Sequence, residues 1–385
     1  MLSSFGTGSV DTSVLSSPAA AQTTASVQST VSATVVSSII TGDPAALSTL
    51  VGSLQLMSYI AMTKIELPTD LTGTLAALNM GSAFSLPYAD RLQTGENSQR
   101  TEDFMQTYGI ESTLFLVNVS AFLGTAMAIL CSFVPVYLLS KVSHPSVSAY
   151  CARLLPSLKW GVPLRLWLPA YLDICIYSLV QVLNVSFSGL YLTFNFLLAC
   201  VFALAAIATP IAMCVFLQQY SHLMLSRSDE AFNKKWGALF AELEANNPAA
   251  NSHYLVYLLR RVVFALCLVL AKDYPACTAL FSCSMSLASL AYLSSARSCA
   301  VPVDQLTAVL TESGVLTVYL AVTAFLLDLP SAVAAGLAVL GVWAARVTVY
   351  VNLVASIYRT VGTVWQVLRV YRAVQRRTVR NKSLV

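Results

Sequence analysis

Long apolar stretches follow one another along the chain from residue 112 to about residue 359. Three of them cover residues 114–139, 190–217 and 303–327, and each exceeds the roughly 20 residues with which a helix crosses a hydrocarbon core about 30 Å thick. Lipid offers no hydrogen-bond partners for backbone N–H and C=O groups, so such stretches must be helical. The pattern predicts an all-α fold, a polytopic helical membrane bundle of seven to eight spans.

Seven spans are well defined by their apolar length, and several are joined by very short connections, which predicts antiparallel hairpins. They cover residues 113–140, 166–187, 190–218, 254–271, 274–294, 302–327 and 330–357. A further helix is predicted over residues 45–63, with Asp43 as its N-cap and Pro44 at its first position. Because this helix also contains Ser, Gly and Gln residues, the sequence leaves open whether it crosses the membrane or lies at its surface.

The polar segments divide the chain into five parts. Residues 1–44 are rich in Ser and Thr and are expected to be flexible, and residues 45–63 form the least certain membrane helix. Residues 64–112 form an acidic loop with seven acidic and three basic residues. Residues 113–357 contain the seven-span bundle, and residues 358–385 form a basic amphipathic tail.

Composition supports a membrane protein and gives no support for an enzyme. Hydrophobic residues make up 57% of the chain and charged residues 10%, whereas soluble proteins carry about 25% charged residues. The cysteines form no CxxC pair and the three His residues are scattered, which predicts neither a disulfide framework nor a zinc site. No GxxxxGKS/T, GxGxxG or HExxH motif occurs. We therefore expect no enzymatic activity, cofactor, bound metal or nucleic-acid partner.

Lysine and arginine residues gather in alternate connections, which predicts the orientation of the chain. They lie in the loops at residues 141–165 and 219–253 and in the tail, whereas the intervening connections hold almost none apart from Lys272. The C-terminus is therefore predicted to be cytosolic, and the 64–112 loop to be extracellular or luminal. A plasma, ciliary or endomembrane location is equally compatible with this pattern.

The tail repeats apolar residues at a helical spacing of three to four between residues 358 and 380. We favour a basic amphipathic helix at the inner headgroup layer, where each basic residue contributes about 1 kcal/mol towards anionic lipid. The alternative is that the last span simply continues as a straight helix. The lipid-facing basic residues in this prediction are Arg359, Arg369, Arg372, Arg376, Arg377 and Arg380.

Ionisable side chains within the spans are the main functional candidates, because burying them in lipid costs several kcal/mol unless they are paired or hydrated. Asp173, Arg260 and Arg261 lie at similar depths, about 9–11 Å from the cytosolic side at 1.5 Å per residue. Matching depth and opposite charge predict an ion pair between Asp173 and one of the arginines. Snorkelling arginines, or a gating role, are the alternatives.

A second set of charges lies in the last two spans. Asp304 and Glu312 are eight residues apart near one face of their helix, and Glu312 reaches towards the middle of the bilayer. Arg346 approaches the same half of the membrane from the final span, which predicts an ion pair with Glu312. An ion-pathway role for the carboxylate is the alternative.

Several short motifs resemble those of one family. They are Lys-Trp-Gly-Ala-Leu-Phe at 235–240, His-Tyr at 253–254, the paired-arginine segment at 258–264, the segments at 53–57, 65–68, 75–79 and 108–112, and Pro302 followed by Glu312. Together, over about residues 35–357, they resemble the TRP-like multi-pass module of fungal flavin-carrier and polycystin-like proteins. A similar module forms the C-terminal membrane region of protist cysteine-rich surface proteins. The resemblance implies cation permeation, calcium handling or surface sensing.

The leading hypothesis is a TRP-like channel, or a channel-related protein, for cations. A membrane anchor or scaffold of a surface or ciliary assembly is an alternative, as is a seven-helix receptor, although no DRY-like or NPxxY-like motif occurs. A transporter is less well supported, since no inverted repeat is evident. The expected partners are the lipid bilayer, anionic lipids of its inner leaflet and further copies of the chain in a homo-oligomer.

Overall fold

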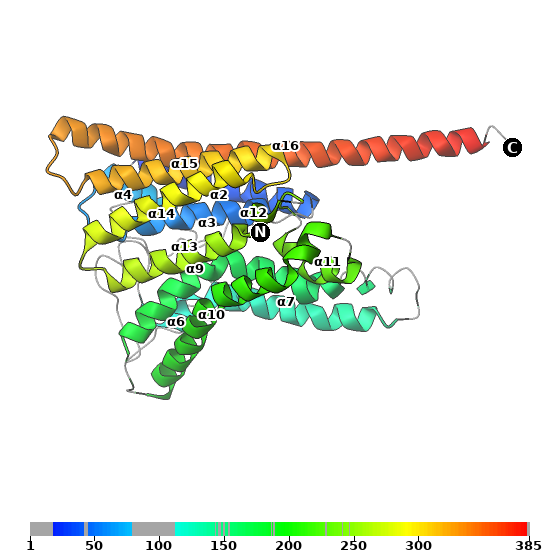
Figure 1. Ribbon diagram of the computed structural model, residues 1–385, viewed down its shortest axis with the longest axis horizontal. Helices are drawn as coiled ribbons and strands as arrows, with labels where there is room; N and C mark the ends of the chain where they lie inside the picture. Colours follow the sequence, from blue (N-terminus) through cyan, green and yellow to red (C-terminus); the bar gives the residue numbers. More distant parts are fainter. Residues whose placement is uncertain are drawn as a thin grey trace.

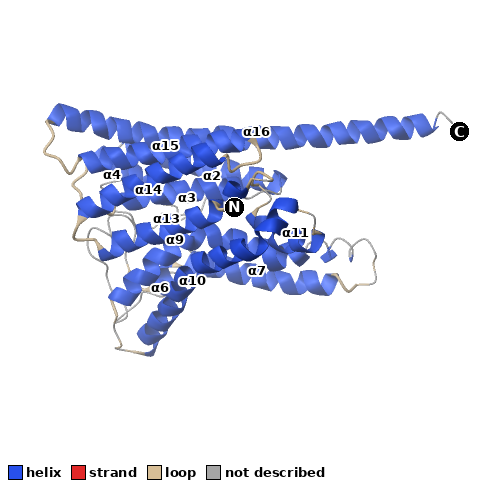
Figure 2. Cartoon of the chain, in the orientation of Figure 1, coloured by secondary structure: helices blue, strands red, loops and turns tan. Residues whose placement is uncertain are grey.

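The apolar stretches form long, closely packed helices in the computed structural model of the chain (Figures 1 and 2). No β-strand occurs among the residues that the structure describes, where one isolated bridge pairs Leu243 with Cys299. The described residues are 18–41, 45–78, 112–142, 144, 148, 151–152, 155–185, 187, 189–227, 229–240, 242–245 and 247–382.

Seven helical segments of this described part are long and apolar enough to cross a membrane. They are α7 (Ser120–Leu139), the π-helical turn η4 (Ser157–Gly161) with α9 (Val162–Leu183), α10 (Leu190–Ser226), α13 (His253–Leu270), α14 (Pro275–Ala296), α15 (Pro302–Ala324) and α16 (Ser331–Lys382). Many large apolar side chains face outward, Leu204 and Val354 among them, as contact with lipid requires. The prediction of an all-α polytopic bundle is confirmed.

Helix α3 (Ala45–Ile60) lies inside this bundle. Leu50, Leu54 and Met57 recur at a helical spacing and are completely buried, and the polar Gln55 is buried as well. The helix contacts α2, α4, α9, α15 and α16. Tyr319 of α15 also donates a hydrogen bond to the carbonyl oxygen of Leu56 at 3.0 Å. Helix α3 is therefore an interior helix of the bundle, and whether it crosses the membrane or lies at the membrane surface stays a prediction.

Helix α2 (Pro18–Thr41) departs from the expected flexible N-terminal segment, of which residues 1–17 and 42–44 lie outside the described part of the chain. It packs along α16 (Figure 1), and Thr23, Thr30 and Thr34 are fully buried. The Thr34 hydroxyl lies 3.1 Å from that of Ser356 in α16. Small side chains allow helices to approach closely, and hydroxyl groups bond across the contact, so a Ser/Thr-rich segment of low hydropathy forms a packed helix.

The connections between the helices separate to the two ends of the bundle. At one end Lys64 forms an ion pair with Asp273 at 2.7 Å, and α4 (Thr69–Ala77) packs against α2 and α16. At the other end Lys235, from α11 (Glu230–Trp236), lies 4.6 Å from the ring centre of Trp160 in the 141–165 loop. Hence the two basic loops meet, as the predicted topology requires, whereas the assignment of this end to the cytosol remains a prediction. Residues 79–111 of the acidic loop lie outside the described residues.

The last span and the tail form one continuous helix, α16, of 52 residues. At 1.5 Å per residue it is about 78 Å long, and its C-terminal part continues far beyond the bundle along the same axis (orange to red in Figure 1). The favoured expectation of a separate helix on the membrane surface is therefore wrong in its geometry, and the straight continuation is observed. Since no proline interrupts residues 331–382, the backbone hydrogen bonds of the helix continue unbroken.

Candidate functional site

Arg260 of α13 and Glu312 of α15 form a buried ion pair, with Nη1 2.5 Å from Oε2 and side-chain exposures of 8% and 9%. The Ser286 hydroxyl of α14 donates a hydrogen bond to the other carboxylate oxygen of Glu312. Ser286 in turn accepts a hydrogen bond from Arg260 Nη2 at 3.4 Å. Three helices therefore converge on one charged cluster, and loss of either charged partner would leave a buried charge without compensation.

Asp173 of α9 does not pair with either arginine. Its carboxylate accepts a hydrogen bond from Gln55 Nε2 at 2.9 Å and one from the Tyr59 hydroxyl at 2.6 Å. The Tyr177 hydroxyl extends this network to Tyr59 at 3.0 Å. The predicted ion pair is therefore wrong: among the described residues no arginine lies within 4.0 Å of Asp173. Matching depth could not reveal that α3 supplies neutral donors to this carboxylate.

Arg346 does not pair with Glu312 either, because the register between α15 and α16 keeps them apart. Asp304 pairs with Arg359 at 2.6 Å, so these two residues lie opposite each other in the antiparallel pair of helices. Arg346 consequently lies more than one helical turn from Glu312, and its Nε donates to the Thr23 hydroxyl of α2 at 3.2 Å.

The prediction that the basic residues of the tail face lipid needs correction at Arg359, which contacts the carboxylate of Asp304. Arg369 lies over the ring of Trp365, at 5.4 Å from its centre. The side chains of the remaining predicted residues, Arg372, Arg376, Arg377 and Arg380, lie outside what the structure describes.

Arg261 is a buried guanidinium group of another kind, because it has no carboxylate partner among the described residues. Only 3% of the residue is exposed, and its Cζ lies 3.4 Å from the centre of the Tyr257 ring. A Cβ atom added at Gly52 of α3 would overlap Arg261 Nη2. The glycine therefore provides the space in which this guanidinium group lies.

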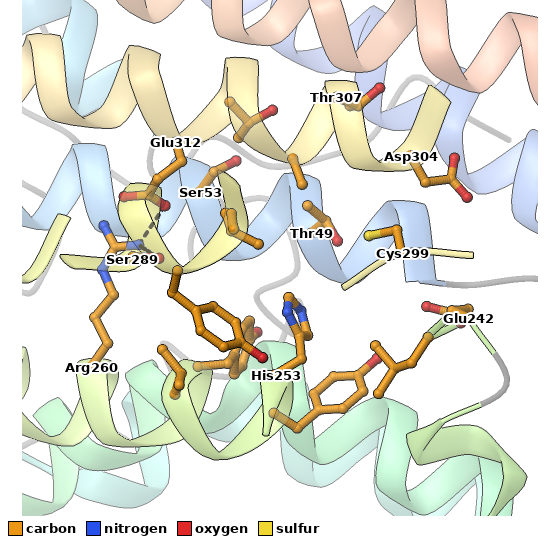
Figure 3. Close-up of a pocket in the computed structure, with 18 of the residues that line it drawn as sticks. Thr49, Ser53, Glu242, His253, Arg260, Ser289, Cys299, Asp304, Thr307 and Glu312 are labelled. Atoms are coloured by element: carbon orange, nitrogen blue, oxygen red, sulfur yellow. Dashed lines mark hydrogen bonds and ion pairs between the residues drawn. The ribbon is translucent and has the colours of Figure 1, made fainter. Parts of the chain in front are cut away.

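A cavity of about 130 Å³ adjoins these groups at the end of the bundle where the basic loops meet. Figure 3 shows Arg260 and Glu312 at one end of the cavity and Asp304, Cys299 and Glu242 at the other. The hydroxyl-bearing residues of its wall are Thr49, Ser53, Tyr254, Tyr257, Ser289, Tyr292, Thr307 and Thr311. In the described part of the chain no group of three or more His, Cys, Asp or Glu side chains is arranged to hold a metal ion.

Cys299 lies in the loop between α14 and α15, at the loop end of the cavity. The pKa of its thiol is raised to about 11, mainly by burial and then by the negative charges of Asp304 and Glu242, while Arg359 acts in the opposite direction. The thiol is therefore protonated at neutral pH and is a poor nucleophile.

Sequence reasoning identified the charges of this region but not the groups that hold them. No role is predicted from the sequence for Gln55, Tyr59 or Ser286, and His253 enters only as one of three scattered histidines and as part of a motif. The available signal is Gly52 within the predicted helix, since small residues let membrane helices approach one another closely.

Comparison with protein-family models, with curated proteins and with solved structures gives no match to this chain. The resemblance to a TRP-like module therefore rests on the short motifs alone. Of these, the paired arginines contribute directly to the cavity wall.

Proposed function

We propose that this multi-pass membrane protein is a channel, or a channel-related protein, for cations. The observation that carries the proposal is the carboxylate of Glu312, which lies in the middle of an apolar helix at the end of a cavity whose wall includes several hydroxyl-bearing residues. Ionisable groups within spans are costly and commonly mark ion pathways. A carboxylate lined up with hydroxyl groups is the kind of oxygen-rich wall that cations prefer.

In this proposal the ion pair acts as a gate. While Arg260 holds Glu312, the carboxylate is neutralised and offers no site to a cation. Separation of α13 from α15 would free the carboxylate towards the cavity. The Asp173 network of α3 and α9 supplies a second polar level within the bundle, so that two carboxylates lie at different places in its interior.

The test is cation flux into liposomes that contain the purified full-length protein. We expect the Glu312→Gln variant to lower the flux by about tenfold or more, since about 1.4 kcal/mol changes a rate tenfold. The matched control is Glu230→Gln, which removes a carboxylate from an exposed ion pair with Lys234. Flux equal to that of empty liposomes, or equal flux in the two variants, would refute the proposal.

A membrane anchor or scaffold is the second candidate, and the extension of α16 favours it. Val361, Val364 and Leu368 are exposed on the part of this helix beyond Arg359, and a helix of this length can reach a partner away from the bilayer. A chain that ends at residue 360 tests the two candidates together. If the protein is a scaffold that binds its partners through the tail, the shortened chain no longer joins its assembly in cells, and cation flux is the same with and without the tail. If the protein is a channel that does not need the tail, the shortened chain keeps both its flux and its cellular assembly.

A further inference from the structure

Among the described residues, Arg261 is the one arginine of the cavity wall that has no carboxylate within ion-pair distance. Glu312 neutralises Arg260, and Asp304 neutralises Arg359. The hydrogen bond that Arg261 makes, from Nη1 to the Tyr257 carbonyl oxygen, is long at 3.5 Å. Asp173 acts on it only from beyond ion-pair distance, because Gln55 and Tyr59 orient that carboxylate.

Two buried nitrogen atoms of the cavity wall have no hydrogen-bond partner among the described residues: Arg261 Nε and His253 Nδ1. His253, Tyr257 and Arg261 are spaced four residues apart and so form one ridge of α13. Figure 3 shows the His253 ring pointing from α13 into the space below α3. An arginine nitrogen is always a donor, and a neutral imidazole donates from Nδ1 in one of its two tautomers. Both atoms therefore suit a ligand that accepts hydrogen bonds.

We propose that this cavity binds a phosphate group, with Arg261 as its main charge partner and His253 as a second donor. A guanidinium group binds phosphate oxygens through charge-assisted hydrogen bonds. The volume of about 130 Å³ holds several water molecules, each of which needs about 10–15 Å³. This is room for one phosphate group with part of its hydration shell.

The carboxylates of the cavity do not oppose such a ligand at this wall. Glu312 and Asp304 are each engaged by an arginine, and Glu242 lies at the far end of the cavity from Arg260 (Figure 3). The phosphate has two sources, a free anion or the headgroup of a lipid that enters from the neighbouring leaflet. The site goes beyond the proposed conduction of cations, and its occupancy is measurable whether or not the protein conducts.

The test uses the full-length protein in maltoside micelles without phosphate, with thermal unfolding followed by tryptophan fluorescence. One arm adds inorganic phosphate against chloride at equal ionic strength, and the other adds phosphatidic acid. We expect at least one arm to raise the unfolding temperature. A response to both assigns the site to phosphate in general, a response to inorganic phosphate alone assigns it to the free anion, and a response to phosphatidic acid alone assigns it to the headgroup.

Three variants link that response to the cavity. Arg261→Gln is expected to weaken binding about tenfold or more, because a charge-assisted hydrogen bond is lost, and His253→Asn to weaken it less. Gly52→Ala displaces the guanidinium group and is expected to resemble Arg261→Gln. The matched control is Gly336→Ala in α16, where an added Cβ meets nothing within 4 Å.

Two outcomes of these measurements would refute the proposal. No response in either arm means that the cavity holds water only. An equal response of the wild-type and Gly52→Ala proteins means that the ligand binds elsewhere. Because the atom that Gly52→Ala displaces is the end of a flexible side chain, this variant is expected to fold even if Arg261→Gln does not.

Discussion

Asp304 and Arg359 join the first turn of α15 to the point where α16 leaves the bundle, with a carboxylate oxygen 2.6 Å from Nη2 and 2.7 Å from Nε. One oxygen thus accepts from two nitrogens of the same guanidinium group. The hydrogen bond between Asn352 Nδ2 and the Thr311 hydroxyl, at 2.9 Å, lies in the same antiparallel register of the two helices.

Because this pair is only partly exposed, we predict that Arg359→Gln destabilises the protein by about 1–2 kcal/mol. The double variant Asp304→Asn with Arg359→Gln is expected to cost less than the two single variants together, with a coupling of about 0.5 kcal/mol or more. The free energy of unfolding in micelles is measured for the wild-type protein, the two single variants and the double variant. Additive effects would show that the contact contributes nothing to stability.

For the buried pair of Arg260 and Glu312 we predict a larger loss of stability when one partner alone is replaced than when both are replaced. Arg260→Leu should cost about 3–5 kcal/mol, since it leaves the Glu312 charge buried and unpaired. Combining Arg260→Leu with Glu312→Leu should recover much of that loss. Lys234→Leu, which breaks an exposed pair, is the control and should change stability by about 0.5 kcal/mol or less. A double variant that is less stable than both single variants would contradict this account.

Because α15 packs closely on α16, the sizes of the side chains at positions 314 and 348 should affect stability jointly. A Cβ added at Gly314 would overlap Oγ1 of Thr348, so Gly314→Ala should lower stability by about 1–3 kcal/mol through overpacking. Thr348→Ala in the same chain removes the overlapping atom and should restore most of the loss. The unfolding temperature reports both, with Gly336→Ala as the control. Equal values for the single and double variants would mean that the helices separate to accept the methyl group.

The raised pKa of Cys299 predicts the pH dependence of its alkylation. In a chain with Cys299 as the only cysteine, the rate with iodoacetamide should be low at neutral pH and rise with pH up to about 11. Glu242→Gln removes a negative charge, lowers this pKa and should speed the reaction at a given pH. The raised pKa also makes the stability of the protein depend on pH. Below the pKa of the thiol in the unfolded chain, its contribution to stability is fully present, and this contribution is lost as the pH rises through about 11. A rate that levels off near pH 8.5, the ordinary range of a thiol, would contradict the prediction.

The orientation of the bundle predicts different labelling at its two ends. A cysteine at Asp273, whose side chain is 66% exposed, should react with an impermeant maleimide from outside intact cells. A cysteine at Lys234, exposed to 63%, should react only after permeabilisation. The background is the chain without its own cysteines, in cells where the protein reaches the surface. The opposite result would reverse the predicted topology.

The sequence was sufficient for the spans but not for their contacts. The apolar run of α10 predicts a membrane span because it exceeds the length with which a helix crosses the hydrocarbon core. Helix α2 was missed, because Ser and Thr lower its hydropathy although their small size is what packs it against α16. Hydropathy measures transfer into lipid, and a helix that contacts other helices need not satisfy it.

The partners of the candidate charges could not be predicted for a related reason. Depth along a helix follows from residue number, but the face that a helix turns to its neighbour does not. The partner predicted for Asp173 is wrong, since α3, the least certain span, supplies Gln55 and Tyr59. The membership of Arg261 in the cavity likewise depends on the space at Gly52, which is visible only when α3 and α13 are placed together.

The unbroken course of α16 gives the molecule a lever. About 23 residues follow Arg359 in this helix, and at 1.5 Å per residue they form an arm of about 34 Å. With the Asp304–Arg359 contact as fulcrum, a tilt of about 5° moves the free end by about 3 Å. The hydrogen bond between Asn352 of α16 and Thr311, the neighbour of Glu312 in α15, lies on the bundle side of this contact, so the arm and the helix that carries the buried carboxylate are directly bonded.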